Sequence, residues 1–155
     1  MTMKPADAGG EGRMKRGIVF GAIALACWVP MTANAQATSG SRAAQAEVLE
    51  EQAWLLANQV REFETAAAYL RAASQLREER GARVRDLLNA GHYLHYANRL
   101  LSAVSAFQDA AEVAREGGDQ DTAERALRNA VWIAAKAGDL ATVRALSAQA
   151  TPGAD

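Results

Sequence analysis

The chain has 155 residues, which is enough for one domain. Its formal net charge of −1 leaves no basic field that could gather nucleic acid. Beyond residue 40 the chain is rich in alanine, leucine, arginine and glutamate, and all three prolines lie outside 41–150. This composition predicts an all-α protein, and the scarcity of β-branched runs argues against strands.

The first 35 residues are predicted to be a secretory signal peptide. Three basic residues within 13–16 precede an apolar run over 17–29, which Pro30 ends. Ala33 and Ala35 supply small residues at the two positions that signal peptidase reads, so we expect cleavage after Ala35. The apolar run is shorter than the ~20 residues that a membrane-spanning helix needs. The mature protein is therefore expected to be periplasmic or secreted.

Two alternatives concern the same segment. Met14 begins a compact signal peptide by itself, which makes it an alternative start of translation. The stretch "ALAC" that ends at Cys27 resembles a lipobox, in which the cysteine is lipidated, although Ala24 stands where leucine is usual. If the signal peptide is removed, the single cysteine goes with it. The mature chain would then have no disulfide, no thiolate nucleophile and no cysteine-ligated metal.

The mature chain is predicted to begin with a flexible lead-in over 36–41, "QATSGS", followed by one helical domain over 42–150 and a tail over 151–155. Six helical segments are expected in the domain, at 42–59, 62–79, 82–97, 99–115, 120–137 and 139–149.

The breaks between these segments carry turn-forming residues. Three glycines are expected to end helices in the left-handed conformation: Gly81, Gly118 and Gly138. Asp121 or Thr122 is expected to cap the fifth segment, and Asp139 lies near the start of the sixth.

The helical segments fall into similar pairs. Ala103, Phe107 and Ala110 form a small–large–small pattern that also stands 37 residues earlier in the chain. The earlier copy consists of Ala66, Leu70 and Ala73. A period of 34 to 40 residues built from helix pairs is typical of an α-solenoid, in which stacked hairpins share one core.

The pattern resembles the tetratricopeptide repeat. It is clearest over 84–111, where the matching residues are Leu87, Ala90, Gly91, Leu94, Asn98, Leu100, Ala103, Phe107 and Ala110. Residues 124–150 match in their first half, and the first pair of helices matches loosely. The resemblance implies antiparallel helical hairpins stacked as a short α-solenoid of about three hairpins. A plain helical bundle is the alternative fold.

In this family the open face of each first helix lines a concave groove where peptides usually bind. A helix turns ~100° per residue, so Arg85, Asn89, His92 and Tyr96 share the face opposite to Leu87, with His95 at its edge. The matching residues 40 positions later are Arg125, Asn129 and Trp132. These seven residues are the candidate peptide-binding site, since Asn amides can pair with an extended backbone and Arg can grip a carboxylate.

The same residues allow other interpretations. His92 and His95 are spaced for shared metal coordination, but no third ligand is evident, and no nucleophile accompanies a His92–Asp86 pair. Four other aromatic residues lie at core-type spacing and are expected to pack in the interior: Trp54, Phe63, Tyr69 and Phe107.

The sequence therefore predicts a non-enzymatic adaptor without a cofactor. Its partner would be a protein or an extended peptide, not nucleic acid, and membrane contact would come only through the signal peptide or a lipidated Cys27. The alternative function is a structural, self-associating helical protein of the cell envelope.

Overall fold

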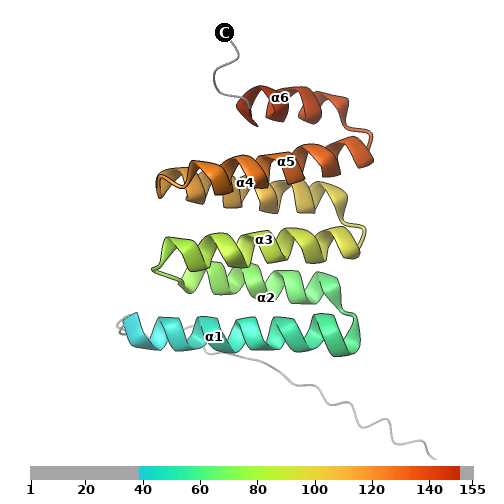
Figure 1. Cartoon of the computed structure of the whole chain (residues 1–155). Coiled ribbons are helices and arrows are strands. Elements are labelled where there is room, and N and C mark those ends of the chain that lie inside the picture. The colour runs from blue at the N-terminus through green and yellow to red at the C-terminus, as the bar shows by residue number, and fades with distance from the viewer. Residues whose placement is uncertain (1–38, 151–155) are drawn as a thin grey trace, which may run out of the picture. The chain divides into compact units, whose positions relative to one another are not determined.

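The computed structural model describes residues 39–150, which form helices and no strand (Figure 1). The helices are α1 (Ser39–Leu55), α2 (Phe63–Leu76), α3 (Arg80–Tyr96), α4 (Leu100–Glu116), α5 (Gln120–Lys136) and α6 (Leu140–Ala150). A short π-helix, η1 (Leu56–Val60), continues α1. The all-α prediction and the six helical segments are confirmed for these residues. The expected signal peptide with Cys27 and the tail 151–155 lie outside them.

Helix α1 begins at Ser39, three residues before the expected start at Arg42. Half of the expected lead-in is therefore helical, because nothing in "SGS" forces the helix to stop. None of the helices over 39–150 is both long enough and apolar enough to cross a bilayer.

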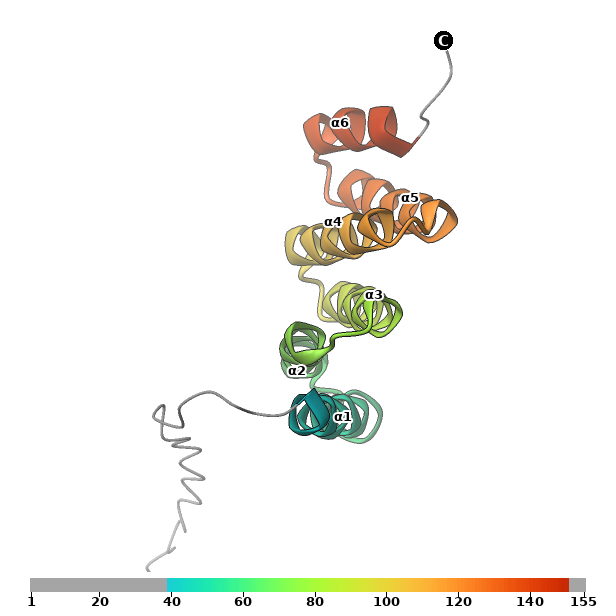
Figure 2. The same cartoon turned by 90° about the vertical axis from the view of Figure 1, so that its left-hand side faces the viewer.

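Each helix packs mainly against the helix before it and the helix after it in the sequence. Figure 2 views the helices from one end, several of them obliquely, and shows them alternating between one layer of α1, α3 and α5 and a second layer of α2, α4 and α6. Ion pairs join alternate helices within each layer. In the first, Arg85 of α3 lies 3.3 Å from Glu50 of α1. In the second, Arg71 of α2 lies 2.7 Å from Asp109 of α4.

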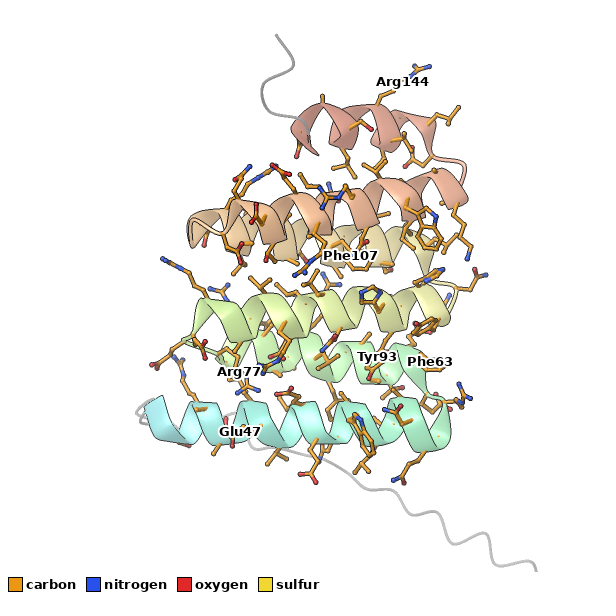
Figure 3. All side chains as sticks on the ribbon, in the orientation of Figure 1. Glu47, Phe63, Arg77, Tyr93, Phe107 and Arg144 are labelled. Carbon is orange, nitrogen blue, oxygen red and sulfur yellow. The ribbon has the colours of Figure 1, made fainter. Side chains whose placement is uncertain are left out.

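The core between the layers is built largely from alanine, which lets helices approach closely. The two small–large–small patterns are buried as expected. Phe107, labelled in Figure 3, is buried and its ring lies over Gly91 of α3. A Cβ atom at Gly91 would lie 2.8 Å from Cζ of Phe107, so only glycine fits there without displacing the ring.

Left-handed residues end several helices. Asn98 has φ of 58°, as suits the turn of the repeat pattern, and Gly118 and Gly138 each have φ of 76°, so the two glycine turns have the predicted conformation. The prediction for Gly81 is wrong, because α3 begins at Arg80 and Gly81 lies in its first turn. The fourth left-handed residue of 39–150 was not predicted: Arg61, with φ of 64°.

The last two helices, α5 and α6, have the same kind of N-terminal cap. The Thr122 amide donates to Oδ1 of Asp119 over 3.0 Å, and the Thr142 amide donates to Oδ1 of Asp139 over 3.0 Å. Hydrogen bonds from the threonine side chains, and then those from the amides, stabilise the ionised aspartates and lower the pKa of each carboxyl. Asp139 thus caps α6, near whose start the sequence placed it. The cap of α5 is Asp119, which precedes the residues expected, because the helix begins at Gln120.

The packing prediction for the aromatic residues is correct for three of four. Phe107 is buried, and Phe63 and Tyr69 are half-buried against the core. Trp54 is 56% exposed, contrary to the prediction. Helix α1 packs mainly on α2, whereas α3 has a neighbouring helix on both sides, so a large ring on α1 has less to cover it.

Candidate functional site

Helix α3 carries four of the seven candidate residues on its exposed side. Arg85, Asn89, His92 and Tyr96 are all exposed, and Leu87 on the other side of the helix is buried. The helical face drawn from the sequence is therefore confirmed. Among the tyrosine, tryptophan and phenylalanine rings of residues 39–150, Tyr96 is the most open, with 62% of its surface exposed.

Helix α5 carries the other three. Arg125 is exposed, Trp132 is 57% exposed, and Asn129 is half-buried. Residues at equivalent positions of α3 and α5 are exposed in the same way, because the two helices turn the same side outward. The exposed pairs are Arg85 with Arg125 and His92 with Trp132.

The structure brings three of the seven into one depression near the start of α3 and α5. Arg85, Asn89 and Arg125 line a hollow of about 330 Å³. The other residues that line it are Arg80, Gly81, Val84, Leu88, Gly117, Asp119 and Thr122. Three arginines against one aspartate make the hollow basic, so an anionic group fits it. We call it the basic depression.

The arginines of the basic depression differ in how they are held. Arg85 lies 3.3 Å from Glu50, and Arg125 donates to the Thr122 hydroxyl over 3.5 Å. Arg80 has no ion pair within residues 39–150. The guanidiniums of Arg80 and Arg125 thus form no ion pair within residues 39–150, and the ion pair of Arg85 is long.

Tyr96 and Trp132 lie at the opposite end of α3 and α5, and His95 connects them. The His95 ring is 5.1 Å from the Trp132 ring in a T-shaped contact and 5.7 Å from the Tyr96 ring. Nζ of Lys136 lies 2.8 Å from Nε2 of His95 and 5.5 Å from the Trp132 ring. The sequence had placed His95 only at the edge of the face, yet it is the residue through which α3 meets α5 here.

The pKa of His95 is lowered by partial burial and by the adjacent Lys136 ammonium. An ammonium can only donate a hydrogen bond, so Nε2 of His95 accepts it and carries no proton. The aromatic end of the face therefore contains a neutral imidazole next to a cation.

His92 does not join the other candidate rings. Although it is exposed, its ring lies edge-on against Phe107 of α4 at 5.1 Å. The contact with Phe107 covers one edge of the ring. This local burial lowers the pKa of His92, and the nearby His95 lowers it further. Asn129 also stands apart, because it does not line the basic depression. The seven residues thus form a basic group and an aromatic group, with His92 and Asn129 in neither.

The aromatic group extends to Phe63, which the sequence had assigned to packing, and to Tyr93. The Phe63 ring lies 5.5 Å from Tyr96 and 6.1 Å from Tyr93, and Figure 3 labels Phe63 and Tyr93 at this end of the helices. The Arg61 guanidinium lies 5.9 Å from the centre of the Phe63 ring. The spacing of Tyr93 and Tyr96, one helical turn apart, was the signal that could have indicated this cluster.

No group of three or more potential ligands for a metal ion occurs within residues 39–150. His92 and His95 have different ring partners, Phe107 for the first and Trp132 and Tyr96 for the second. Asp86, the carboxylate considered beside His92, is buried and bound to Arg77.

No protein-family model, curated protein or solved structure matches this chain.

Proposed function

We propose that this chain is an exported, non-enzymatic adaptor that binds a partner protein or an extended peptide on α3 and α5. The supporting observation is that Arg85, Asn89 and Arg125, chosen from two equivalent helices, line a single basic depression. The proposal includes no cofactor and no nucleic acid.

We further propose that the helices are three tetratricopeptide-like hairpins stacked as a short α-solenoid. Packing between successive helices and their alternation between two layers support this arrangement (Figure 2). The turn residue Asn98 and the close contact between Gly91 and Phe107 support it as well, because they stand where the repeat pattern requires a left-handed turn and a small residue.

The two groups of candidate residues define the chemistry of a fitting ligand. Acidic groups would lie in the basic depression, and an apolar side chain would contact Tyr96 and Trp132. Arg85 and Tyr96 are eleven residues apart on α3, a distance of about 16 Å at 1.5 Å per residue. An extended peptide covers that distance in about five residues. The proposed ligand is therefore a segment with an acidic residue and an apolar residue about five positions apart.

The test begins by isolating a partner from envelope extract with the mature chain and measuring its affinity. The variant Arg85→Gln with Arg125→Gln should weaken binding and reduce its dependence on salt, because two cations are removed. Asn89→Ala with Asn129→Ala should also weaken it through lost backbone pairing. Arg128→Gln is the matched control, since Arg128 is exposed on α5 but lies outside the basic depression. If both double variants remain folded by circular dichroism and bind like the control, the partner binds elsewhere.

The alternative is a structural protein that associates with itself. It is favoured by four large apolar side chains exposed on α1 and η1: Val48, Trp54, Leu55 and Val60. Exposed apolar groups of this kind are typical of interaction surfaces. Sedimentation equilibrium of the mature chain would decide: a dimer or larger species that Trp54→Ser converts to a monomer favours this function, and a monomer at all concentrations excludes it.

Export is proposed from the sequence of 1–35. Mass spectrometry of the protein made in a secreting bacterium should give an N-terminus at Gln36. A lipidated Cys27 would instead establish the lipoprotein route, and an intact N-terminus would exclude both.

A further inference from the structure

A second hollow lies at the other end of α3 from the basic depression, where η1 turns into α2. It measures about 480 Å³ and is lined by Ala57, Asn58, Arg61, Phe63, Tyr93 and Tyr96. Its volume lies within the range of pockets that hold small molecules, which is about 300–1,000 Å³. We propose that it binds a small aromatic carboxylate: a flat ring that carries one carboxylate group. We call it the aryl pocket.

Three rings from two helices supply the apolar part of the aryl pocket. Phe63 opens α2, while Tyr93 and Tyr96 stand on adjacent turns at the end of α3. The Phe63 ring is inclined at 40° to Tyr93 and 53° to Tyr96, so the three rings are not stacked flat on one another. Tyr96 remains 62% exposed. Rings that only completed the core would be covered, whereas these present surface to the hollow, and a further ring can contact them edge-to-face or offset.

Arg61 supplies the charge. Its guanidinium lies 5.9 Å from the centre of the Phe63 ring, and it forms no ion pair within residues 39–150. Nearby Glu64 does not neutralise it, because Glu64 pairs with Arg99 over 2.9 Å. Arg61 is the only charged residue in the lining, so the pocket is cationic. A planar guanidinium next to a ring fits a carboxylate attached to an arene.

The backbone conformation of Arg61 is a separate observation that points to a role for its side chain. Among the left-handed residues of 39–150, three are the types that adopt this conformation readily: Asn98, Gly118 and Gly138. Arg61 is the exception. Either Asn or Gly would satisfy the turn with less strain, so the turn itself does not require arginine.

The turn holds Arg61 firmly. The amides of Arg61 and Glu62 both donate to the carbonyl of Leu56, the second over 3.0 Å. This closes the π-helix η1, and π-helical turns often occur at functional sites. The Asn58 side chain is also fixed, since its amide nitrogen donates to the Trp54 carbonyl over 2.9 Å. The polar groups of the aryl pocket are therefore positioned before a ligand arrives.

The inference does not depend on the proposed adaptor function. The aryl pocket shares only Tyr96 with the candidate face and no residue with the basic depression. Substituting Arg61 therefore tests the aryl pocket, and substituting Arg85 and Arg125 separately tests the adaptor function.

The experiment is a titration of the mature chain with phenylacetate, followed by amide shifts in two-dimensional NMR. We expect saturable shifts confined to residues of η1, the start of α2 and the end of α3. 2-Phenylethanol is the neutral comparator, which has the ring but no carboxylate. We expect it to bind about tenfold more weakly or worse, because a hydrogen bond to a charged group is lost.

Two variants test the role of Arg61. Arg61→Asn keeps a residue that accepts the left-handed turn and removes the charge, so it should melt no lower than the parent chain yet lose about tenfold or more in affinity. Arg125→Gln is the control, because it removes a cation from the basic depression alone and should leave the affinity for phenylacetate unchanged.

Three results would overturn the proposal: no saturable shift up to about 10 mM phenylacetate, equal binding of 2-phenylethanol, or unchanged affinity in a folded Arg61→Asn variant. A tripeptide that ends in phenylalanine, with a free or amidated C-terminus, identifies the source of the ligand. If phenylacetate binds more tightly than the tripeptide with a free C-terminus, the ligand is a free small molecule. A tripeptide that binds far more tightly than phenylacetate overturns that source and assigns the pocket to a chain terminus.

Discussion

Nε of Arg77 lies 3.3 Å from Oδ2 of Asp86, and that carboxylate is fully buried between the first three helices. Arg77 also pairs with Glu50 of α1, and Figure 3 shows Arg77 between α1 and α3. The second carboxylate oxygen of Asp86, Oδ1, has no hydrogen-bond partner among the described residues. The equivalent position in α5 is Ala126, so the charge network is particular to the first half of the chain. One arginine thus connects the first helix, the second turn and the third helix.

Removing Arg77 should destabilise the fold strongly. Arg77→Met leaves the carboxylate of Asp86 buried without its cation, and losing one partner of such a pair costs about 3–5 kcal/mol. Adding Asp86→Ala should recover much of this loss, because alanine fits the equivalent position in α5. Urea unfolding of the two single variants and the double variant measures the coupling. A double variant less stable than either single variant would contradict this account.

Asp86 should also make stability depend on pH. Burial raises the pKa of this carboxyl above its usual value of 3.8, although Arg77 opposes the shift. The folded protein therefore holds this proton more tightly than the unfolded chain, so the contribution of Asp86 to stability is largest below pH 3.8. It declines as pH rises through the folded pKa. The stability of Asp86→Asn relative to the parent should increase from pH 4 to pH 7. Chemical unfolding at several pH values tests this, and a pH-independent difference would refute it.

Gly91 should be more sensitive to substitution than its neighbour His92. A leucine at Gly91 would overlap the ring of Phe107, and overpacking of this kind costs about 1–3 kcal/mol or more. His92→Ala removes only an edge contact with Phe107 from an exposed residue and should cost about 0.5–1.5 kcal/mol. Thermal melts compare the two variants, and a larger loss for His92→Ala would show that α3 does not pack on α4 through Gly91.

Lys136→Met should raise the pKa of His95. The ammonium of Lys136 helps to keep that pKa below 6.5, so its removal should bring the value closer to 6.5. Nuclear magnetic resonance titration of the two histidines measures this directly. His92 is the comparison: its pKa is lowered by burial and by His95, so it should not rise when His95 gains charge. A fall in the pKa of His95 would contradict the contact.

The lowered pKa of His95 also determines in which direction stability changes with pH. Because the folded pKa of His95 is depressed, its contribution is present above pH 6.5 and is lost as pH falls through the folded pKa.

The helices and the face of α3 could be predicted from the sequence because both follow from periodicity. Residues such as Leu87 and Asn89 stand two positions apart, and the helical turn alone places them on different sides. What could not be predicted depends on distant segments. His95 meets Trp132 only because the ends of α3 and α5 lie together, and Asp86 is tolerated only because Arg77 reaches it.

The aryl pocket was missed for a local reason. Nothing in "VREF" distinguishes a left-handed arginine from an ordinary helix end, and propensity would place glycine or asparagine there. Phe63 was assigned to packing because its spacing fits a core position, and it does contact the core while one side faces Tyr93 and Tyr96. A residue that serves two environments cannot be recognised from spacing alone.

Packing between successive helices has a consequence for how the chain reaches its fold. Nearly every tertiary contact joins segments that are close in the sequence, so the contact order is low and folding should be rapid. A growing chain can form each hairpin as soon as its second helix emerges. Local opening need not spread either: α6 can detach while the charge network around Arg77 stays closed, so amide protons of α6 should exchange with solvent well before those of α3.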